Sequence, residues 1–208
     1  MRITSYPLGP LDTNCYVLDH QGRALAVDPG GDPADVLDFL KAQGLVLEHI
    51  LVTHLHFDHM YGCAALTRAT GAPITAPEDD RFLMDTELGS GGVYGFPRVE
   101  SFRSLPAATG ECSYIGLACR CLPTPGHTPG SVSYYFPDAA AAFVGDVIFY
   151  RSVGRTDFPG GDAAQLKRAV QEQIFTLPGG TTLYPGHGME TTVDSEKRHN
   201  PFFLNDML

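Results

Sequence analysis

The sequence of 208 residues contains no apolar run that approaches the ~18–20 residues of a membrane-spanning helix. Its first seven residues, Met-Arg-Ile-Thr-Ser-Tyr-Pro, lack the apolar core of a secretory signal peptide. Basic residues are scarce, with 14 Lys and Arg against 24 Asp and Glu, so the net charge is −10 and broad binding to nucleic acid or to an anionic membrane is disfavoured. We therefore expect a cytoplasmic protein with neither a nucleic acid nor a membrane as partner.

Cysteine is also sparse, and its five positions (15, 63, 112, 119 and 121) form an odd set that does not suit a disulfide framework. We expect free and mostly buried thiols. Cys119 and Cys121 stand two residues apart and would face one side of a strand, where apolar packing is favoured over a role as a thiolate pair. A chain of this length buries roughly 70–75% of its unfolded surface, so it folds without disulfides or a structural metal, and any metal site is expected to be functional.

The pattern of apolar residues and turn signals predicts an α/β protein formed by one domain over residues 1–208. Strands are expected at 3–6, 14–18, 24–27, 50–52, 112–122, 131–136, 141–145 and 181–184. Helices are expected at 33–43, 60–70, 78–84, 163–175 and 193–199, with Asp32 and Asp162 as caps and Pro33 at a first helical position. The Gly-rich, aperiodic segment 85–98 predicts a long loop that acts as a lid. Two sheets packed face to face with helices outside accommodate this order.

Four segments share one design, in which a strand-like run ends and a His or Asp follows at once. They are Ile-Leu-Val-Thr-His54, Cys-Leu-Pro-Thr-Pro-Gly-His127, Ala-Phe-Val-Gly-Asp146 and Thr-Leu-Tyr-Pro-Gly-His187. Functional groups collect beyond the carboxyl ends of strands in open α/β sheets, so these four side chains are expected to converge. Convergence of imidazole and carboxylate groups predicts a metal site.

The segment His54-x-His56-x-Asp58-His59 is the densest part of this signal. It has neither the two His at i and i+4 of a zinc-protease helix nor the paired Cys of a zinc finger. Positions 54, 56, 58 and 59 are separated by two, two and one residues, a spacing that does not place all four side chains on one face of a helix. We therefore expect a loop to present them, and such a loop can bind two adjacent ions. In this prediction each ion keeps room for a shared water, and the ligands are His54, His56 and His127 for one ion, Asp58, His59 and His187 for the other, and Asp146 for both.

With these motifs the sequence resembles the metallo-β-lactamase superfamily, and within it the small glyoxalase II-like (hydroxyacylglutathione hydrolase-like) proteins. The resemblance runs from Leu-Gly-Pro-Leu-Asp-Thr-Asn-Cys-Tyr at 8–16 to Asn-Pro-Phe at 200–202. It includes Thr-His-Leu-His-Phe-Asp-His, Pro-Gly-His-Thr-Pro-Gly-Ser, Gly-Asp146 and Pro-Gly-His-Gly, and Gly-Arg-Thr-Asp-Phe-Pro-Gly-Gly at 154–161 points to the subgroup.

This resemblance implies a four-layer αββα sandwich of two mixed β-sheets with helices outside and the metals at one edge. It also implies the ligand assignment given above, with two divalent ions, Zn by preference and Fe or Mn as alternatives. The expected activity is hydrolysis of S-(2-hydroxyacyl)glutathione or a related small anionic thioester. A metal-bridging hydroxide would attack the thioester carbonyl, and Asp58 would orient this hydroxide, which gives that residue a catalytic role in addition to metal binding.

Two departures from glyoxalase II proper leave the acyl group and the thiol carrier open. About twenty residues follow His187, so we expect the C-terminal helical domain of that enzyme to be absent. Leu204 and Asn205 stand where a basic residue is expected after Asn-Pro-Phe. Arg155 is the candidate substrate-binding residue, through a substrate carboxylate, and a loop brace between Arg155 and Asp157 is the alternative.

Other activities use the same residues. A persulfide dioxygenase would need one iron held by His54, His127 and Asp146, and a lactone or ester hydrolase would use the same pair of metals. A β-lactamase is disfavoured because a Cys is expected where Asp146 stands. An RNA-processing nuclease is disfavoured by the net charge of −10, and a non-catalytic metal-binding protein by the intact ligand set. The oligomeric state stays open.

Overall fold

The computed structural model describes residues 1–204, and Asn205 lies outside the described residues. The chain divides into two compact units. The first unit comprises residues 1–108 and 113–117, and the second comprises residues 109–112 and those from 118 onward. The expectation of a single domain over residues 1–208 stays a prediction.

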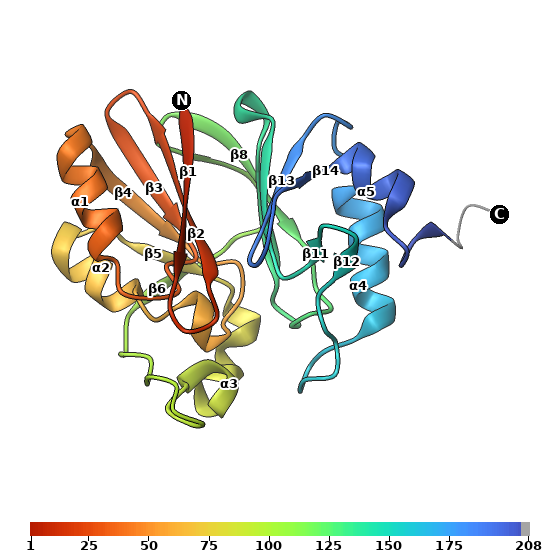
Figure 1. The fold of residues 1–208 in the computed structure, drawn as a ribbon, viewed down its shortest axis with the longest axis horizontal. Helices are drawn as coiled ribbons and strands as arrows, with labels where there is room; N and C mark the ends of the chain where they lie inside the picture. Colours follow the sequence, from red (N-terminus) through yellow and green to blue (C-terminus); the bar gives the residue numbers. More distant parts are fainter. Residues whose placement is uncertain (205–208) are drawn as a thin grey trace. The chain divides into compact units, whose positions relative to one another are not determined.

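The first unit contains a six-stranded mixed sheet in the order β1-β2-β3-β4-β5-β6 (Figure 1). The strands are β1 (Arg2–Leu8), β2 (Thr13–His20), β3 (Arg23–Val27), β4 (Val46–Leu51), β5 (Ile74–Ala76) and β6 (Ser104–Pro106). Strands β1 to β3 pair antiparallel and confirm the expected meander, whereas β3 to β6 pair in parallel. The strand expected at 50–52 begins earlier, at Val46, because the polar Glu48 and His49 of β4 hide its apolar pattern.

In this unit, the last residues of the helices agree with the prediction better than their first residues do. The helices are α1 (Ala34–Gln43), the 3-10 turn η1 (Phe57–His59), α2 (Cys63–Thr70), the 3-10 helix η2 (Glu78–Asp85) and α3 (Glu87–Ser90). The helix expected at 33–43 is present but begins at Ala34, so Pro33 is the N-cap residue and not the first helical residue as expected. The Asp32 carboxylate accepts from the backbone N of Ala34 at 3.1 Å. The helix expected at 60–70 begins only at Cys63, because residues 60–62 form a turn between η1 and the helix, with Gly62 at the N-cap.

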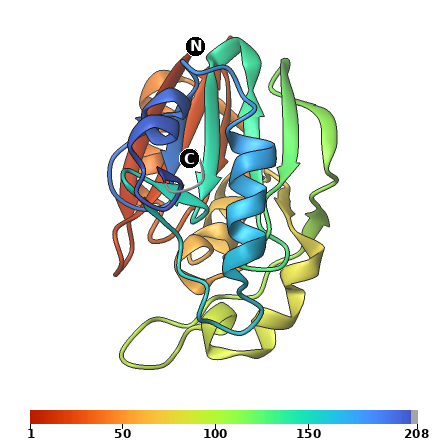
Figure 2. The ribbon, with the colours of Figure 1, turned by 90° about the vertical axis from the view of Figure 1, so that its right-hand side faces the viewer.

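The segment 85–98 is not wholly irregular as expected. It includes α3, and residues Gly91 and Arg98 form an isolated antiparallel bridge that closes the loop between them. This segment, yellow-green in Figure 2, extends beyond the strand ends of the first unit. A role as a lid stays a prediction.

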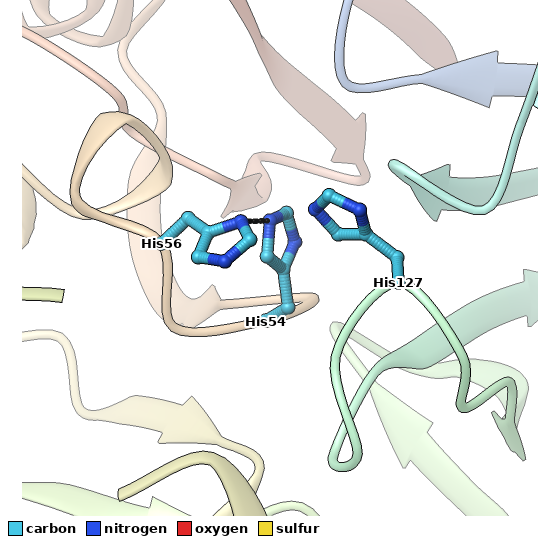
Figure 3. A group of neighbouring side chains, drawn as sticks. All are labelled: His54, His56 and His127. Carbon is cyan, nitrogen blue, oxygen red and sulfur yellow. Dashed lines mark hydrogen bonds between the residues drawn. The ribbon is translucent and has the colours of Figure 1, made fainter. Parts of the chain in front are cut away.

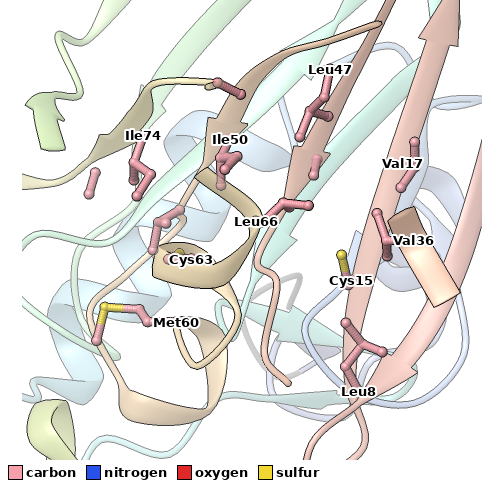
Figure 4. Close-up of a cluster of buried hydrophobic side chains, with 14 of the residues drawn as sticks. Leu8, Cys15, Val17, Val36, Leu47, Ile50, Met60, Cys63, Leu66 and Ile74 are labelled. Carbon is pink, nitrogen blue, oxygen red and sulfur yellow. The ribbon is translucent and has the colours of Figure 1, made fainter. Parts of the chain in front are cut away.

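The core of the first unit lies between one face of its sheet and the helices α1 and α2. Val36 of α1 and Leu66 of α2 are fully buried against Val17 of β2 and Ile50 of β4 (Figure 4). Each such side chain contributes roughly 1.5–3 kcal/mol when it leaves water completely. This core supports the loops that follow β3 and β4.

The second unit contains a second mixed sheet, in the order β14-β13-β10-β9-β8-β7, and a separate hairpin. Its strands are β7 (Gly110–Tyr114), β8 (Leu117–Pro123), β9 (Val132–Phe136), β10 (Ala141–Gly145), β13 (Thr182–Pro185) and β14 (Thr191–Thr192), and the hairpin is β11 (Ile148–Phe149) with β12 (Ser152–Val153). The expected single strand at 112–122 is wrong. The chain turns at Ile115 and Gly116, whose φ angles of 49° and 81° are left-handed, and Ile is an uncommon residue there.

Helices cover one face of this second sheet. They are α4 (Ala163–Ala169), which continues as the π-helical η4 (Val170–Ile174), and α5 (Val193–His199), while η3 (Pro137–Ala139) joins β9 to β10. The Asp162 cap is confirmed, since its side chain accepts from the backbone N of Gln165 at 2.9 Å. Leu166 and Val170 pack with Val144 of β10 and Leu183 of β13 in one buried cluster.

Two mixed sheets with helices are therefore present, as the sequence predicts. All five cysteines lie among the described residues and are free thiols, as expected. Within residues 1–204, no helix combines the length and the hydropathy that crossing a bilayer requires.

Candidate metal centre

The His-rich segment 54–59 leaves the sheet of the first unit directly after β4. The backbone N of Val52 still donates to the carbonyl oxygen of Thr75 on β5 at 2.9 Å, and the chain then turns into η1. Both neighbours of β4, namely β3 and β5, run parallel to it. The segment thus lies at the carboxyl edge of parallel strands, the edge where functional groups collect in open α/β sheets.

His54 and His56 direct ring nitrogens toward each other (Figure 3). Nε2 of His54 and Nδ1 of His56 lie 3.1 Å apart, and both residues are buried. Two nitrogens bound to one tetrahedral zinc at ~2.0–2.1 Å would be about 3.3 Å apart, so the spacing fits two ligands of one ion. On the other side of the His54 ring, Nδ1 lies 3.1 Å from Oγ1 of Thr53, a contact that fixes the ring orientation.

His59 is held between two carboxylates. Its Nδ1 lies 3.0 Å from Oδ2 of Asp28, and its Nε2 lies 3.6 Å from Oδ2 of Asp58. A carboxylate that accepts the proton of one ring nitrogen leaves the lone pair of the other nitrogen for a metal. Asp28 therefore prepares Nε2 of His59 for an ion that Asp58 would share.

Asp28 is a site residue that the sequence analysis does not identify. It is buried and also accepts from the backbone N of Thr53 at 2.8 Å and from its Oγ1 at 2.7 Å. Asp28 follows Val27 at the end of β3, so the rule that finds the other candidates, a strand followed at once by His or Asp, also applies to it.

Two further polar residues support the same segment and carry no local signal in the sequence. Thr13 Oγ1 donates to Oδ2 of Asp58 at 2.9 Å. The backbone N of Leu55 donates to Oδ2 of Asp80, which is fully buried, at 3.2 Å. Each partner lies at least 25 residues away in the chain, so only the folded structure reveals these contacts.

In the second unit, Asp146 lies between two histidines. Its Oδ2 is 3.7 Å from Nε2 of His127 and 3.6 Å from Nε2 of His187. His127 belongs to the loop between β8 and β9, Asp146 follows β10, and His187 follows β13. The structure thus gathers the three predicted residues of this unit around one carboxylate oxygen.

The tautomer of His127 follows from its other neighbour. Nδ1 lies 2.8 Å from the carbonyl oxygen of Arg155. A carbonyl oxygen only accepts hydrogen bonds, so Nδ1 carries a proton, and Nε2 is the ring nitrogen that faces Asp146. Nε2 of His127 (Figure 3) is therefore the nitrogen that a metal would use.

Gly154 allows this arrangement because the backbone approaches very closely there. A Cβ atom at this position would collide with the carbonyl oxygen of Asp146 and would lie 3.3 Å from Nδ1 of His127. Any other residue would push Asp146 and His127 apart. The glycine in the Val-Gly-Arg sequence is thus required by contact with two candidate ligands.

Arg155 pairs with Asp157 through two hydrogen bonds of 2.7 Å each, and its guanidinium lies 3.7 Å from the centre of the Phe158 ring. The hydrogen bonds from Arg155 are the main reason that the pKa of Asp157 is lowered to about 2. The structure therefore contains the loop brace that the sequence analysis gives as the alternative. Substrate binding by Arg155 stays a prediction.

Arg155 also lines a cavity of about 470 Å³ within the second unit. Leu166, Phe202 and Phe203 supply apolar surface in this cavity, and Lys167 provides a second cationic side chain. Such a cavity suits a ligand that combines an apolar body with an anionic group. It borders His127 through the carbonyl of Arg155.

Aromatic packing links the loop over residues 91–98 to the His-rich segment of the same unit. The rings of Phe96 and Phe57 lie 5.1 Å apart, and those of Phe57 and Tyr61 lie 5.4 Å apart. Burial and, to a lesser degree, the charge of Asp58 raise the pKa of Tyr61 to about 12, so its phenol keeps its proton at neutral pH. Tyr94 at the loop tip is 92% exposed.

The buried cysteines are unsuited to metal binding. Burial raises the pKa of Cys121 to about 12 and that of Cys119 further, so both remain thiols at neutral pH. Because the thiolate is the form that binds metal, their packing role in β8 is favoured, as the sequence analysis expects.

A family model described as the metallo-beta-lactamase superfamily matches residues 8–187, a range that includes every candidate ligand. A relative in Bacillus subtilis (strain 168), named "Probable metallo-hydrolase YqgX", is 36% identical over 205 residues and 97% of each chain. The "Hydroxyacylglutathione hydrolase GloC" of Haemophilus influenzae is 32% identical over 97% of this chain and 98% of its own.

Solved structures with the same architecture are also known. The structure of "BLEG-1 B3 metallo-beta-lactamase" is 36% identical, with a TM-score of 0.91 over 98% of this chain and 100% of that one. The structure of "TTHA1623 in a di-iron-bound form" is 34% identical, with a TM-score of 0.86 over 96% of this chain and 99% of that one. These similarities confirm the fold class that the sequence predicts.

Proposed function

Because the chain belongs to the metallo-β-lactamase superfamily and is a metallo-hydrolase, we propose that it hydrolyses small anionic thioesters, with S-(2-hydroxyacyl)glutathione or a related compound as substrate. The observation that carries the proposal is the state of His127, which has Nδ1 fixed by a backbone carbonyl at 2.8 Å and Nε2 directed at Asp146. The thioester assignment is supported by the relative named as a hydroxyacylglutathione hydrolase.

The donor sets of the two units fit two divalent ions. In the first unit, nitrogens of His54 and His56 lie 3.1 Å apart and Nε2 of His59 lies 3.6 Å from Oδ2 of Asp58. In the second unit, one oxygen of Asp146 lies 3.6–3.7 Å from nitrogens of two histidines. These spacings are close to those of ligands on one ion. We propose the division predicted from the sequence, in which His54, His56 and His127 would hold one ion, Asp58, His59 and His187 would hold the other, and Asp146 would contribute to both. Zinc is our assignment, with iron or manganese as alternatives because a similar solved structure holds two irons.

When bound, the ions would lower the pKa of coordinated water and polarise the thioester carbonyl. The chain's own contribution is to hold each group in place. Asp58, fixed by the hydrogen bond from Thr13, orients the attacking water through its carboxylate. The leaving group needs no dedicated acid, because a thiol of pKa near ~8.5 leaves readily as the thiolate.

Substrate recognition falls to the cavity of the second unit in this proposal. Arg155 and Lys167 give it local positive charge in a chain whose net charge is −10. Arg155 binds a carboxylate of the substrate, exchanging Asp157 for it, while Leu166 and the Phe residues 202 and 203 contact apolar parts. The enzyme acts in the cytoplasm on a small molecule, without a nucleic-acid or membrane partner.

β-Lactam hydrolysis is a second candidate, because one similar structure is named as a B3 metallo-β-lactamase. Asp146, which stands where a Cys is expected for that activity, disfavours it, and a comparison of substrates decides between the two activities. A mononuclear-iron persulfide dioxygenase remains the alternative from a different reaction class, with His54, His127 and Asp146 as its iron ligands.

The test is a substrate panel on the purified, zinc-loaded protein. We expect release of free thiol from S-lactoylglutathione, measured with a thiol reagent, and a loss of at least about 100-fold in kcat/KM for Asp58→Ala. His199→Ala is the matched control, because His199 is an exposed histidine on α5 outside the ligand set. Turnover of nitrocefin without thioester hydrolysis would move the chain to the β-lactamases, and oxygen uptake with glutathione persulfide by an iron-loaded sample would move it to the dioxygenases.

A further inference from the structure

Glu196 on α5 is fully buried, and its carboxylate accepts hydrogen bonds from four groups. Oε1 accepts from Nη1 of Arg151 and from Oγ1 of Thr191, both at 2.6 Å. Oε2 accepts from the backbone N of Arg151 at 3.0 Å and from Nδ2 of Asn200 at 2.9 Å. A buried carboxylate is tolerated only when it is paired and hydrogen-bonded in this way, so the geometry around Glu196 is tightly specified.

Two of the hydrogen bonds to Glu196 come from Arg151 in the turn of the hairpin β11–β12. Arg151 stands in that turn with a φ of 58°, in the left-handed region that disfavours a residue with a side chain. Its guanidinium also donates to the carbonyl oxygen and the Oγ of Ser195, each at 3.1 Å, and Asn200 Nδ2 donates to the carbonyl oxygen of Ser152 at 2.9 Å. Strands of two residues are too short to hold a hairpin alone, so these contacts fix its position.

The hairpin also connects two parts of the candidate metal centre. Asp146 comes two residues before β11, and Gly154 and Arg155 come directly after β12. Gly154 packs against the carbonyl of Asp146, and the carbonyl of Arg155 accepts the Nδ1 proton of His127. A displacement of the hairpin would therefore move both Asp146 and His127.

From these contacts we propose that Glu196 is a positioning residue of the metal centre. It fixes Arg151, Arg151 fixes the hairpin, and the hairpin holds Asp146 and His127 at the spacing that an ion requires. The inference rests on the proposed function, because it takes Asp146 and His127 as metal ligands.

The test is metal binding by Glu196→Gln. The glutamine has nearly the shape of the glutamate, but it places an NH₂ group among groups that are themselves donors, so part of the network around Arg151 is lost. We expect the affinity for Co²⁺, measured by competition with a chromophoric chelator, to fall about tenfold or more. We also expect the visible absorption of the Co²⁺-loaded protein to change, because it reports the coordination geometry.

A matched control separates positioning from a general loss of stability. Phe136→Leu alters a fully buried residue at the far end of β9 from the loop of His127, and it should lower the melting temperature without changing the Co²⁺ spectrum. Arg151→Gly is a second variant that keeps the left-handed turn without strain but removes the guanidinium. It should reproduce the loss of metal affinity whether or not Glu196→Gln folds well.

The outcomes distinguish the inference from the proposed function. The positioning role would be overturned if Arg151→Gly and folded Glu196→Gln kept the wild-type metal affinity and spectrum. It would also be overturned if Phe136→Leu, at the same melting temperature, lost as much metal affinity as these two variants. Failure of the wild-type protein to bind Co²⁺ or Zn²⁺ would instead overturn the proposed function, and the inference with it. A selective loss in the two hairpin variants supports the inference.

Discussion

The Nδ1 atom of His59 lies 3.0 Å from the carboxylate of Asp28, which comes from a different strand end of the same sheet. This contact fixes the proton on Nδ1 and turns Nε2 toward Asp58. It shows how the first unit prepares a histidine as a ligand, and it can be tested by substitution.

Replacing Asp28 by Asn should weaken metal binding, because the amide is uncharged and no longer raises the basicity of the His59 ring. We expect a loss of about 10–100-fold in affinity for Zn²⁺, measured by chelator competition. Asp19→Asn is the control, since the Asp19 carboxylate pairs with the exposed Arg2 at 2.9 Å and lies outside the candidate ligand set. Equal affinities of the two variants would contradict the role given to Asp28.

Replacing Thr13 by Val should impair catalysis by removing the donor to Asp58 at 2.9 Å. Loss of a buried hydrogen bond to a charged group costs about 1.5–3 kcal/mol, which corresponds to a drop of roughly 10–100-fold in kcat/KM if the loss falls on the transition state. Thr13→Ser keeps the hydroxyl and should retain most of the activity. A serine variant as impaired as the valine variant would show that the methyl group of Thr13, and not its hydroxyl, is what matters.

Replacing Gly154 by Ala should disturb the second unit directly. The new Cβ would collide with the carbonyl of Asp146 and approach His127, so we expect a loss of about 1–3 kcal/mol in the free energy of unfolding together with weaker metal binding. Gly180→Ala is the matched control, because no atom of residues 1–204 lies within 4 Å of where its Cβ would be. Chemical denaturation with and without Zn²⁺ measures both effects, and equal behaviour of the two variants would contradict the close approach.

Variants of Arg155 and Asp157 separate substrate binding from the loop brace. If Arg155 binds a substrate carboxylate, Arg155→Ala should raise KM by about tenfold with little change in kcat, since a charge-assisted hydrogen bond contributes about 1.5–3 kcal/mol. Asp157→Asn should lower KM, because it frees the guanidinium for substrate. If both variants have a lower melting temperature but an unchanged KM, Arg155 acts only as a loop brace with Asp157 and does not bind substrate.

The sign of the pH dependence follows from the lowered pKa of Asp157. Because the folded value is about 2, the Arg155–Asp157 pair is intact at and above neutral pH. Its contribution to stability is complete above the ordinary carboxyl pKa near ~4 and is lost as the pH falls toward the folded value. The KM effects of both variants are thus expected to persist across the neutral range.

Much of the fold follows from local signals in the sequence. The helix α1 and the cap at Asp162 were predicted because apolar spacing and capping residues agree there. The turn at Ile115 and Gly116 was missed because an Ile in a left-handed conformation gives no turn signal. The start of α2 was misplaced because residues 60–62, although apolar in part, form a turn between η1 and the helix.

The candidate ligands were predictable because each follows the end of a strand, where the topology gathers side chains. The residues that orient these ligands were not. Thr13 lies 45 residues from Asp58 in the chain, and Glu196 lies 45 residues from Arg151, so their roles depend on distant segments meeting in the fold. Contacts between residues so far apart in the chain have no local sequence signal and become visible only in the folded structure.

The most direct test of the account is the metal content of the purified chain, measured by elemental analysis after loading and exhaustive dialysis. We predict close to two divalent ions per wild-type chain and about one in His59→Ala, whose remaining ligands still include the pair His54 and His56. A single iron per wild-type chain, unchanged by His59→Ala, would contradict a two-metal hydrolase.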